Sequence, residues 1–551
     1  MTISYLKLKK IAFFCLALPS AVFAVGFLKW YIGIPLALLL AVAYWFSVRD
    51  MKAEEDQSLR FSIPSLLILI GVATFWCYLG GLGNLYSQSD DWCARNAIFR
   101  DLIRFEWPVI YQNKNAGLVY YIGYWLPSAL IGRGVYLVTD SVRVAFFVGN
   151  IALWLWSVVC VTVVWLLLLV YLKANKRPRM WLVVLIFIFF SGLDIVGTLY
   201  NTLFKHWRFP IHIEWWTSYQ FSSMTTALNW VFNQSIFAWL ATVCFLFEKR
   251  VRNYAFIIVC LLSSAPLPAV GLAIYMVGYA VYYLVGAIRK KEAGGFWRDV
   301  FTVQNILPVL TFLPVYFLYY MSNLAVNVGQ MHTVVLPRDW WGIAIVGTLT
   351  LAAVILAWVF REKKLLTARP KVWITIIVFL ALTVVMMLLR PTVRIQYFLF
   401  LLMEAGVFLF LVWQDHENDL LFYLTWIAAF LCPLITVGTA GDFCMRASIP
   451  VVFVMMVMCI RYLFDHGASL GEKGFSVQKL LCILLIIALV LGAVTPIVEF
   501  WRGVRDFAQG KRAFDWIYTM ERIFTGEKVG TDRNFIANDY KSHFFFRYLA
   551  K

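Results

Sequence analysis

Long apolar stretches alternate with short charged clusters along almost the whole chain. A helix needs ~17–25 residues to cross a bilayer, and the pattern gives about fifteen crossings. We predict spans at residues 10–28, 31–48, 61–82, 142–171, 180–199, 231–247, 255–267, 269–288, 301–321, 340–360, 372–389, 396–413, 419–437, 447–463 and 478–498. The pattern therefore predicts an all-α polytopic membrane protein.

The spans predicted at 255–267 and 269–288 form a broken pair. Between them the chain reads Ser-Ser-Ala-Pro-Leu-Pro at residues 263–268. We expect this break to leave two pieces too short to cross upright, with irregular backbone covered by protein or lining a cavity.

Composition strengthens the membrane interpretation. The chain has 551 residues, of which 62% are hydrophobic and 14% charged, against roughly 25% charged in soluble domains. Mean hydropathy is +0.77. Soluble enzymes, disordered scaffolds, secreted disulfide frameworks and nucleic-acid modules are therefore excluded as whole-chain interpretations, and a lipid bilayer is the expected surrounding.

The net charge of +18 would suggest a nucleic-acid partner in a soluble chain. Here Lys and Arg instead gather in alternate loops at the ends of the spans, so no nucleic acid is expected. The positive-inside rule places these loops and the N-terminus in the cytoplasm, with the tail from residue 499 outside. Residues 1–24 imitate a signal peptide, but a second span follows at once, so we expect an uncleaved first helix.

The spans and loops divide the chain into four parts. These are N-terminal transmembrane helices at 1–83, an outer loop with amphipathic helices and an acidic motif at 84–141, a transmembrane bundle at 142–498, and a small outer C-terminal cap at 499–551.

The acidic motif of the outer loop is Asp90-Asp91, followed by Trp92. Apolar residues recur at helical spacing after it, which predicts an amphipathic helix on the membrane surface that ends near Trp107-Pro108. Ser89 and the two acids could simply cap this helix. Alternatively, a carboxylate in a partly desolvated site is what a general base requires.

Several other polar residues fall on the predicted outer face. Arginine forks bind phosphate oxygens, although interface anchoring or ion pairing is the structural alternative. The candidate phosphate- or substrate-binding residues are Arg95, His212, Glu214, Arg390, Arg394, Asp442 and Arg446. The Trp-rich loop 200–230 suits sugar stacking, but Trp also belts membrane interfaces.

Metal-ligand spacing is absent from the ten cysteines and six histidines. His206 and His212 share a loop with Glu214, so a divalent cation remains open as a cofactor, although no metal site is assigned. A disulfide between Cys93 and Cys444 is a further alternative.

With these features, the chain resembles the GT-C superfamily of polytopic glycosyltransferases. The likeness rests on Asp90-Asp91-Trp92 at the start of the first large outer loop, on its continuation through 100–103 and 107–109, and on residues 441–450, which are similar to a segment of bacterial members. Two spans precede the acidic loop where that superfamily usually has one, and a large C-terminal domain and a W-W-D-type segment are missing.

The resemblance implies a GT-C-like bundle of about 13–15 transmembrane helices in a bacterial inner membrane. It implies a polyprenyl-phosphate-linked sugar donor, an acceptor that is a lipid, a glycan or a protein, and an acidic residue as catalytic base. Asp91 or Asp90 would deprotonate the acceptor, and Arg390 and Arg394 would hold the donor phosphate.

Two rival functions remain open. A flippase or transporter for a lipid-linked saccharide would need polar residues deep in the membrane, where Asp194 and Glu404 lie, but no convincing repeat is visible. A polysaccharide polymerase differs little at the level of sequence.

Overall fold

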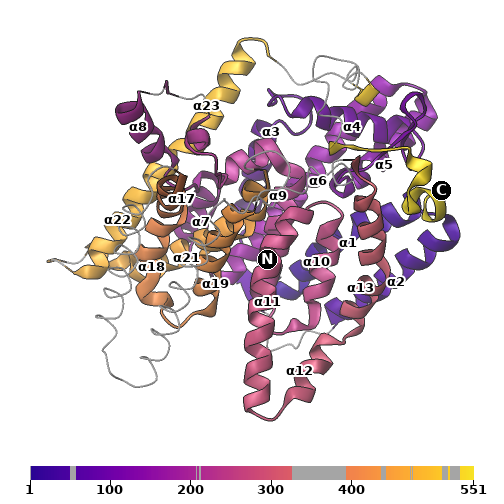
Figure 1. The fold of residues 1–551 in the computed structure, drawn as a ribbon. Coiled ribbons are helices and arrows are strands. Elements are labelled where there is room, and N and C mark those ends of the chain that lie inside the picture. The colour runs from indigo at the N-terminus through magenta and orange to yellow at the C-terminus, as the bar shows by residue number, and fades with distance from the viewer. Residues whose placement is uncertain are drawn as a thin grey trace. The chain divides into compact units, whose positions relative to one another are not determined.

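The computed structural model describes residues 2–49, 57–206, 208–209, 212–324, 393–435, 442–471, 473–474, 476–511, 519–521 and 534–551. Ten helices in these ranges are long and apolar enough to cross a membrane, and three shorter apolar helices accompany them. Together they occupy every predicted span except 340–360 and 372–389, which lie outside the described residues. The prediction of an all-α polytopic membrane protein is confirmed (Figure 1).

The chain divides into two compact units. Unit 1 comprises Met1–Ile188, Met224–Met331 and Pro496–Lys551, and unit 2 comprises Phe189–Ser223 and His332–Thr495. The acidic motif belongs to unit 1, whereas His212, Glu214, Asp442 and Arg446 belong to unit 2.

Unit 1 holds the longest and most hydrophobic helices of the N-terminal half. Its helices are α1 (Tyr5–Phe27), α2 (Trp30–Arg49), α3 (Ile63–Leu79), α4 (Trp92–Arg104), α5 (Leu126–Thr139), α6 (Val142–Tyr171), α7 (Arg177–Phe189, up to Ile188), α9 (Met224–Phe247), α10 (Tyr254–Leu262), α11 (Pro266–Arg289), α12 (Ala293–Val300), α13 (Val303–Met321) and most of α23 (Val494–Ala508).

Three tryptophans mark the core of unit 1. The Trp76 ring of α3 stacks between Trp165 of α6 and Trp239 of α9, with ring centroids 5.7 Å and 5.8 Å apart. Trp165 and Trp239 are fully buried and Trp76 is almost so. Aromatic packing therefore joins three helices that are well separated in sequence.

One charged pair is also buried in unit 1. Lys9 of α1 lies 2.6 Å from the Glu248 carboxylate at the end of α9, and both side chains are less than a tenth exposed. The same carboxylate accepts a hydrogen bond from Asn253 at 2.8 Å. The pairing satisfies two charges that burial would otherwise make costly.

A small sheet joins the loop at 84–141 to the C-terminal tail. Its strands are β3 (Ile110–Tyr111), β4 (Ala116–Leu118) and β5 (Ile536–Asn538), all antiparallel, with Gly117 opposite Ala537. A second sheet pairs β1 (Thr2–Ser4) with β2 (Ser58–Arg60). In the first sheet, the Phe546 ring covers the space where a side chain at Gly117 would lie. The tail thus packs on the loop, and residues 499–508 of the expected cap continue α23.

The break at residues 263–265 separates α10 from α11 as predicted, but one part of that prediction is wrong. Helix α10 has nine residues, whereas α11 has 24. At 1.5 Å per residue, the second piece is long enough to cross a bilayer upright. Pro266 sits at the first helical position of α11, where its missing N–H costs nothing, so it starts a full-length helix.

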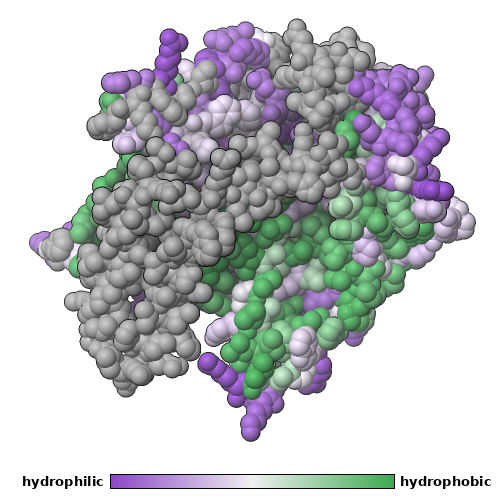
Figure 2. Space-filling view, viewed as in Figure 1, coloured by the Kyte–Doolittle hydropathy of each residue, from purple (hydrophilic) through white to green (hydrophobic). Residues whose placement is uncertain are grey.

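The surface of unit 1 has the polarity expected of membrane helices. Figure 2 shows hydrophobic residues along the sides of α11 and α13, and hydrophilic residues at the end of α11 near α12. Exposed apolar side chains on α11 include Val277, Val281 and Ile288.

The described part of unit 2 contains seven α-helices. They are α8 (Asp194–Lys205), α17 (Val393–Leu401), α18 (Val407–His416), α19 (Leu420–Leu431), α20 (Asp442–Ala447), α21 (Ile449–His466) and α22 (Val477–Gly492). A π-helical turn, Leu402–Gly406, joins α17 to α18. Such turns frequently accompany functional sites.

Candidate functional site

The acidic motif lies at the start of α4, where the sequence places it. Asp91 is the N-cap residue, but its side chain makes no capping hydrogen bond to the helix. The hydroxyl of Ser89, expected as the cap, has no partner among the described residues. The capping interpretation therefore does not account for the Asp91 carboxylate.

The Asp91 carboxylate is instead bound by Arg95, one turn into α4. Arg95 Nη2 donates to Asp91 Oδ2 at 3.1 Å. The two side chains differ sharply in burial, because Asp91 is 52% exposed and Arg95 only 5%. Asp90 is exposed as well. The Asp91 carboxylate is therefore accessible to solvent, and the buried Arg95 guanidinium binds one of its oxygens.

Two nitrogens of the Arg95 guanidinium donate no hydrogen bond to the described residues. Nε and Nη1 are buried and have no hydrogen-bond partner in the parts of the chain that the structure describes. Buried polar atoms are almost always satisfied, and a buried cation with spare donors is especially costly. A bound anion would supply the missing acceptors.

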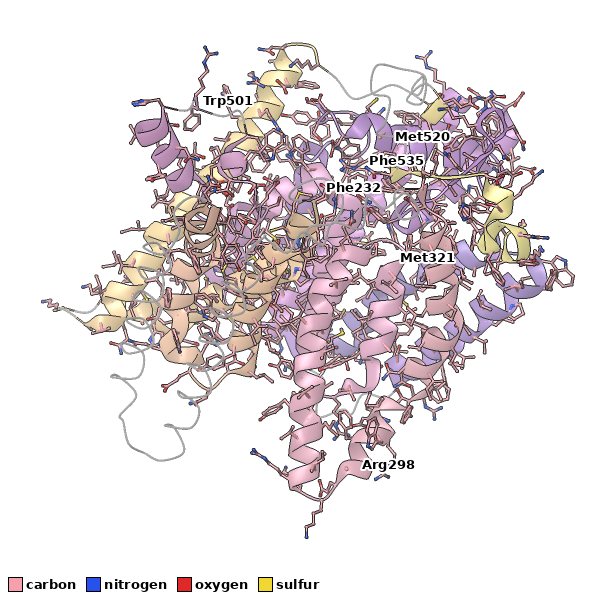
Figure 3. All side chains as sticks on the ribbon, in the orientation of Figure 1. Phe232, Arg298, Met321, Trp501, Met520 and Phe535 are labelled. Carbon is pink, nitrogen blue, oxygen red and sulfur yellow. The ribbon has the colours of Figure 1, made fainter. Side chains whose placement is uncertain are left out.

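Trp92 fixes the start of α4 on α9. Its ring stacks on Phe232, with centroids 4.6 Å apart, and its Nε1 donates to the Asn229 carbonyl at 2.7 Å. Helix α9 has a non-helical residue at Val231, which interrupts the hydrogen-bond ladder close to that carbonyl. Phe232 is labelled in Figure 3. Trp92 therefore positions Asp91 and is itself 1% exposed, too buried to stack on a sugar.

The prediction of a helix after the acidic motif is confirmed, but α4 ends at Arg104 and its polar face is not open. Asn96 and Arg100 are 3% and 5% exposed, so both are covered by protein. Asn96 donates to Gln88 Oε1 at 2.8 Å. Polar partners from other segments therefore enclose this face instead of leaving it open to water.

Asp101 is the centre of that enclosed face. It accepts from Arg100 at 2.8 Å, from the Tyr111 hydroxyl at 3.1 Å and from the Met520 backbone N–H at 3.2 Å. Burial raises the pKa of Asp101, and the Arg100 guanidinium and these hydrogen bonds oppose the rise. Met520 is labelled in Figure 3. This carboxyl joins α4, β3 and the C-terminal tail, and it is structural.

A second cation lies along the same part of α9. Trp230 follows Asn229, and its Nε1 donates to Glu499 Oε2 at 3.2 Å. Arg502 is hydrogen-bonded to Glu499 and stacks over the Trp230 ring at 4.9 Å. Arg502 is not among the predicted site residues, although its place just after the last apolar span is a signal in the sequence.

In unit 2, Glu214 is buried and fully engaged. Its carboxylate accepts from Gln220 Nε2 at 2.6 Å, from the Ser222 hydroxyl at 2.9 Å and from the Ser223 N–H at 2.9 Å. His212 Nε2 lies 3.8 Å away. These contacts fasten the turn Ile213–Trp216 to residues 220–223 and leave Glu214 little capacity for a substrate.

The predicted phosphate-binding arginines are described only in part. Arg446 is buried and pairs with Asp442 Oδ1 at 3.0 Å, one turn apart on α20. Arg390 lies outside the described residues, and Arg394 is described only as a backbone position of α17. The structural alternative weighed for Arg446, an ion pair with Asp442, is therefore present.

Two further carboxyls are buried in unit 2. Asp194 Oδ2 accepts from Ser191 at 2.9 Å and from Thr495 at 3.1 Å. Glu404, fully buried in the π-helical turn, lies against Gly192 and is influenced by the charges of Asp194 and Glu214. Intramembrane carboxyls of this kind are candidates for function.

No cluster of three or more metal-ligating side chains occurs among the described residues. Neither Cys93 nor Cys444 is disulfide-bonded in the described structure, so the possible disulfide is not formed. Cys444 donates to the Gln220 carbonyl at 3.3 Å. No family model, curated protein or solved structure matches the chain.

Proposed function

We propose that the chain is a membrane glycosyltransferase that moves a sugar from a polyprenyl-phosphate donor to a hydroxyl acceptor at the outer membrane face. The observation that carries the proposal is the pair formed by Asp91 and Arg95. It offers an accessible carboxylate that does not cap its helix and a buried guanidinium with two unsatisfied nitrogens. The resemblance of the acidic motif to GT-C enzymes supports the same reaction.

In the proposed reaction, Asp91 takes the proton of the acceptor hydroxyl. The hydroxyl oxygen then attacks the anomeric carbon, and the bond from that carbon to the phosphate oxygen breaks. Polyprenyl phosphate leaves with the electron pair. One base and no enzyme nucleophile imply a direct displacement with inversion. The spare donors of Arg95 would stabilise the charge that develops on the phosphate.

The remaining assignments are proposals of the same kind. Arg446, Arg390 and Arg394 would bind phosphate oxygens, and Asp442 would orient Arg446. The acceptor would be a lipid, a glycan or a protein. The membrane would be the bacterial inner membrane, with the N-terminus cytoplasmic and the C-terminus periplasmic.

The test compares purified wild type with Asp91→Asn and Asp90→Asn, using labelled sugar on a panel of polyprenyl-phosphate donors. Asp91→Asn should bind donor normally and lose transfer by about 10²–10⁴-fold, the range of general-base catalysis. Asp90→Asn is the matched control, because it removes the adjacent acid from the same turn. Normal transfer by Asp91→Asn, with both variants folded, would overturn the assignment of the base.

A second candidate function is transport of a lipid-linked saccharide, which the buried Asp194 and Glu404 favour. This function predicts that reconstituted protein moves a labelled lipid-linked sugar between leaflets without consuming it. Loss of that movement in Glu404→Gln, with no transfer by wild type on any donor, would favour the transporter.

A further inference from the structure

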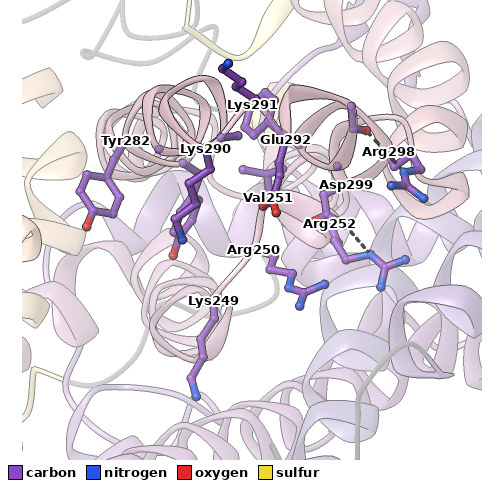
Figure 4. A pocket seen from close by; sticks show the side chains of 16 residues that line it. Lys249, Arg250, Val251, Arg252, Tyr282, Lys290, Lys291, Glu292, Arg298 and Asp299 are labelled. Carbon is purple, nitrogen blue, oxygen red and sulfur yellow. Dashed lines mark hydrogen bonds and ion pairs between the residues drawn. The ribbon is translucent and has the colours of Figure 1, made fainter.

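An open cavity of about 1070 Å³ lies at one end of α11, within unit 1. Three segments supply its walls: the turn at 249–252 after α9, the end of α11 with the following residues, and α12 from Gly294 to Asp299. Figure 4 shows side chains from all three segments around the opening. These loops are on the side that the positive-inside rule predicts to be cytoplasmic.

The lining is strongly basic. It includes six basic side chains and two acidic ones, Glu292 and Asp299. The basic residues are Lys249, Arg250, Arg252, Lys290, Lys291 and Arg298. Arg252 Nε lies 3.3 Å from Asp299 Oδ1, which uses one of the two acids. Lys249, Arg250, Lys290 and Lys291 have no ion pair within the described parts of the chain, so most of the positive charge is uncompensated.

Backbone groups add a second feature suited to an anion. The start of α12 lines the cavity through Gly294 and Gly295, and the end of α11 lines it through Gly286. A Cβ added at any of these three positions would meet only open space. A helix start carries unsatisfied N–H groups and a partial positive charge, and glycine lets a ligand approach that backbone closely.

The side chains around this cavity are of the kinds found at the level of lipid headgroups. On α12, Trp297 is 47% exposed and stacks on Phe301, with centroids 5.8 Å apart. Exposed apolar residues run along the adjoining part of α11, including Val281 and Ile288. Exposed aromatic residues beside a basic turn are typical of the membrane interface.

We propose that this cavity binds the phosphate-containing headgroup of an anionic phospholipid, whose acyl chains lie along the apolar side of α11. The positive-inside rule explains why basic residues occur in these loops. It does not explain their convergence from three segments on one cavity with a helix start and open glycines. The ligand chemistry is a phosphate ester with net negative charge, bound by Arg250, Lys290 and the start of α12.

The test uses the full chain in neutral detergent, titrated with dioctanoyl phosphatidylglycerol or dioctanoyl phosphatidylcholine and followed by native mass spectrometry. Wild type should bind the anionic lipid in preference to the zwitterionic one. The double variant Arg250→Gln/Lys290→Gln should weaken anionic-lipid binding by roughly tenfold or more. The matched control is Lys176→Gln/Arg177→Gln, which removes two exposed basic residues on the same predicted side but outside the cavity.

A third variant, Gly294→Asp, tests the cavity without removing any cation. The new carboxylate would enter open space at the first turn of α12, a position favourable to that helix. The Gly294→Asp variant should bind less lipid, and its melting temperature should equal that of wild type. Equal losses in the cavity and control double variants would overturn the proposal, because they would indicate diffuse surface charge.

A last arm distinguishes the lipid from a soluble phosphate. Inorganic phosphate and glycerol 3-phosphate are added as competitors at the concentration of the lipid. Lipid binding should persist, because the acyl chains contribute contacts along α11. Displacement of the lipid by either competitor at equal concentration would overturn the lipid assignment and indicate a soluble phosphate ligand.

Discussion

The Asp91 carboxylate and the Arg95 guanidinium lie one turn apart on α4, with Arg95 Nη2 3.1 Å from Asp91 Oδ2. An exposed pair of this spacing is worth little to stability. Here one partner is buried, so the pair has a defined geometry and the arginine has a desolvated position. The burial of Arg95 distinguishes this pair from the solvent-exposed ion pairs that are common on helix surfaces.

Arg95 should be needed for sugar transfer more than for folding. We expect Arg95→Gln to lower kcat/KM by about 10²–10³-fold, as for loss of a charge-stabilising donor. Arg95→Lys should retain only part of the wild-type kcat/KM, because an ammonium group lacks the two-pronged geometry of the guanidinium group. Initial rates over a range of donor concentrations, with melting temperatures in parallel, give the answer.

Arg104 supplies the control, because it is an exposed arginine at the other end of α4. Arg104→Gln should leave kcat and KM close to wild type. If Arg95→Gln kept its kcat while its melting temperature dropped, the buried guanidinium would be structural only.

The buried pair of Lys9 and Glu248 should be strongly coupled. Lys9→Met leaves the Glu248 carboxylate buried without its cation, which should cost ~3–5 kcal/mol of unfolding free energy. Lys9→Met/Glu248→Gln should recover most of that loss. Unfolding by sodium dodecyl sulfate, followed by tryptophan fluorescence, gives the unfolding free energies of wild type and variants for a double-mutant cycle. Lys10→Met is the matched control, since Lys10 is exposed, and an equal loss there would argue against coupling.

Asp101 should make stability depend on pH. Burial raises its pKa, with Arg100 opposing, so the folded state holds the proton more tightly than the unfolded chain. Its contribution to stability is full below the usual carboxyl pKa and is lost as pH rises through the raised value. The melting temperature of wild type relative to Asp101→Asn should therefore fall from pH 4 towards neutrality.

The exposed Asp140 gives the reference for that pH series. Asp140→Asn occupies the same left-handed backbone position without strain, because Asn tolerates it. A difference between wild type and Asp140→Asn that followed the Asp101→Asn profile would contradict the assignment to Asp101.

The spans were predictable because hydrophobic length alone specifies them. Helix α4 was also predictable, since its apolar residues recur at helical spacing, and Asp91 does lie at its start. The enclosure of Arg100 and Asp101 was not, because it depends on Tyr111 and on the backbone of Met520, which is more than 400 positions along the chain. Local patterning shows which face is polar but not what covers it.

The strands β3, β4 and β5 were missed for a related reason. They contain two or three residues each, too few for an alternating pattern, and β5 comes from the tail. The surroundings of Glu214 were hidden for the same reason. Its Trp-rich loop predicts a substrate ligand, and the sequence does not show that Gln220, Ser222 and Ser223 donate hydrogen bonds to its carboxylate.

Glu404 and Gly192 should behave as a coupled pair in unit 2. A Cβ at Gly192 would clash with the Glu404 carboxyl group, so Gly192→Ala should lower the melting temperature by several degrees. Glu404→Gln should keep or raise it, because the amide removes a buried acid beside Asp194 and brings a donor. In Gly192→Ala/Glu404→Ala, the carboxyl group no longer occupies the space of the new methyl, and only the close approach to the Glu404 Cα, at 2.8 Å, is left. The double variant should therefore lose less than the sum of its single variants. Simple additivity in the thermal melts would show that the two residues do not meet.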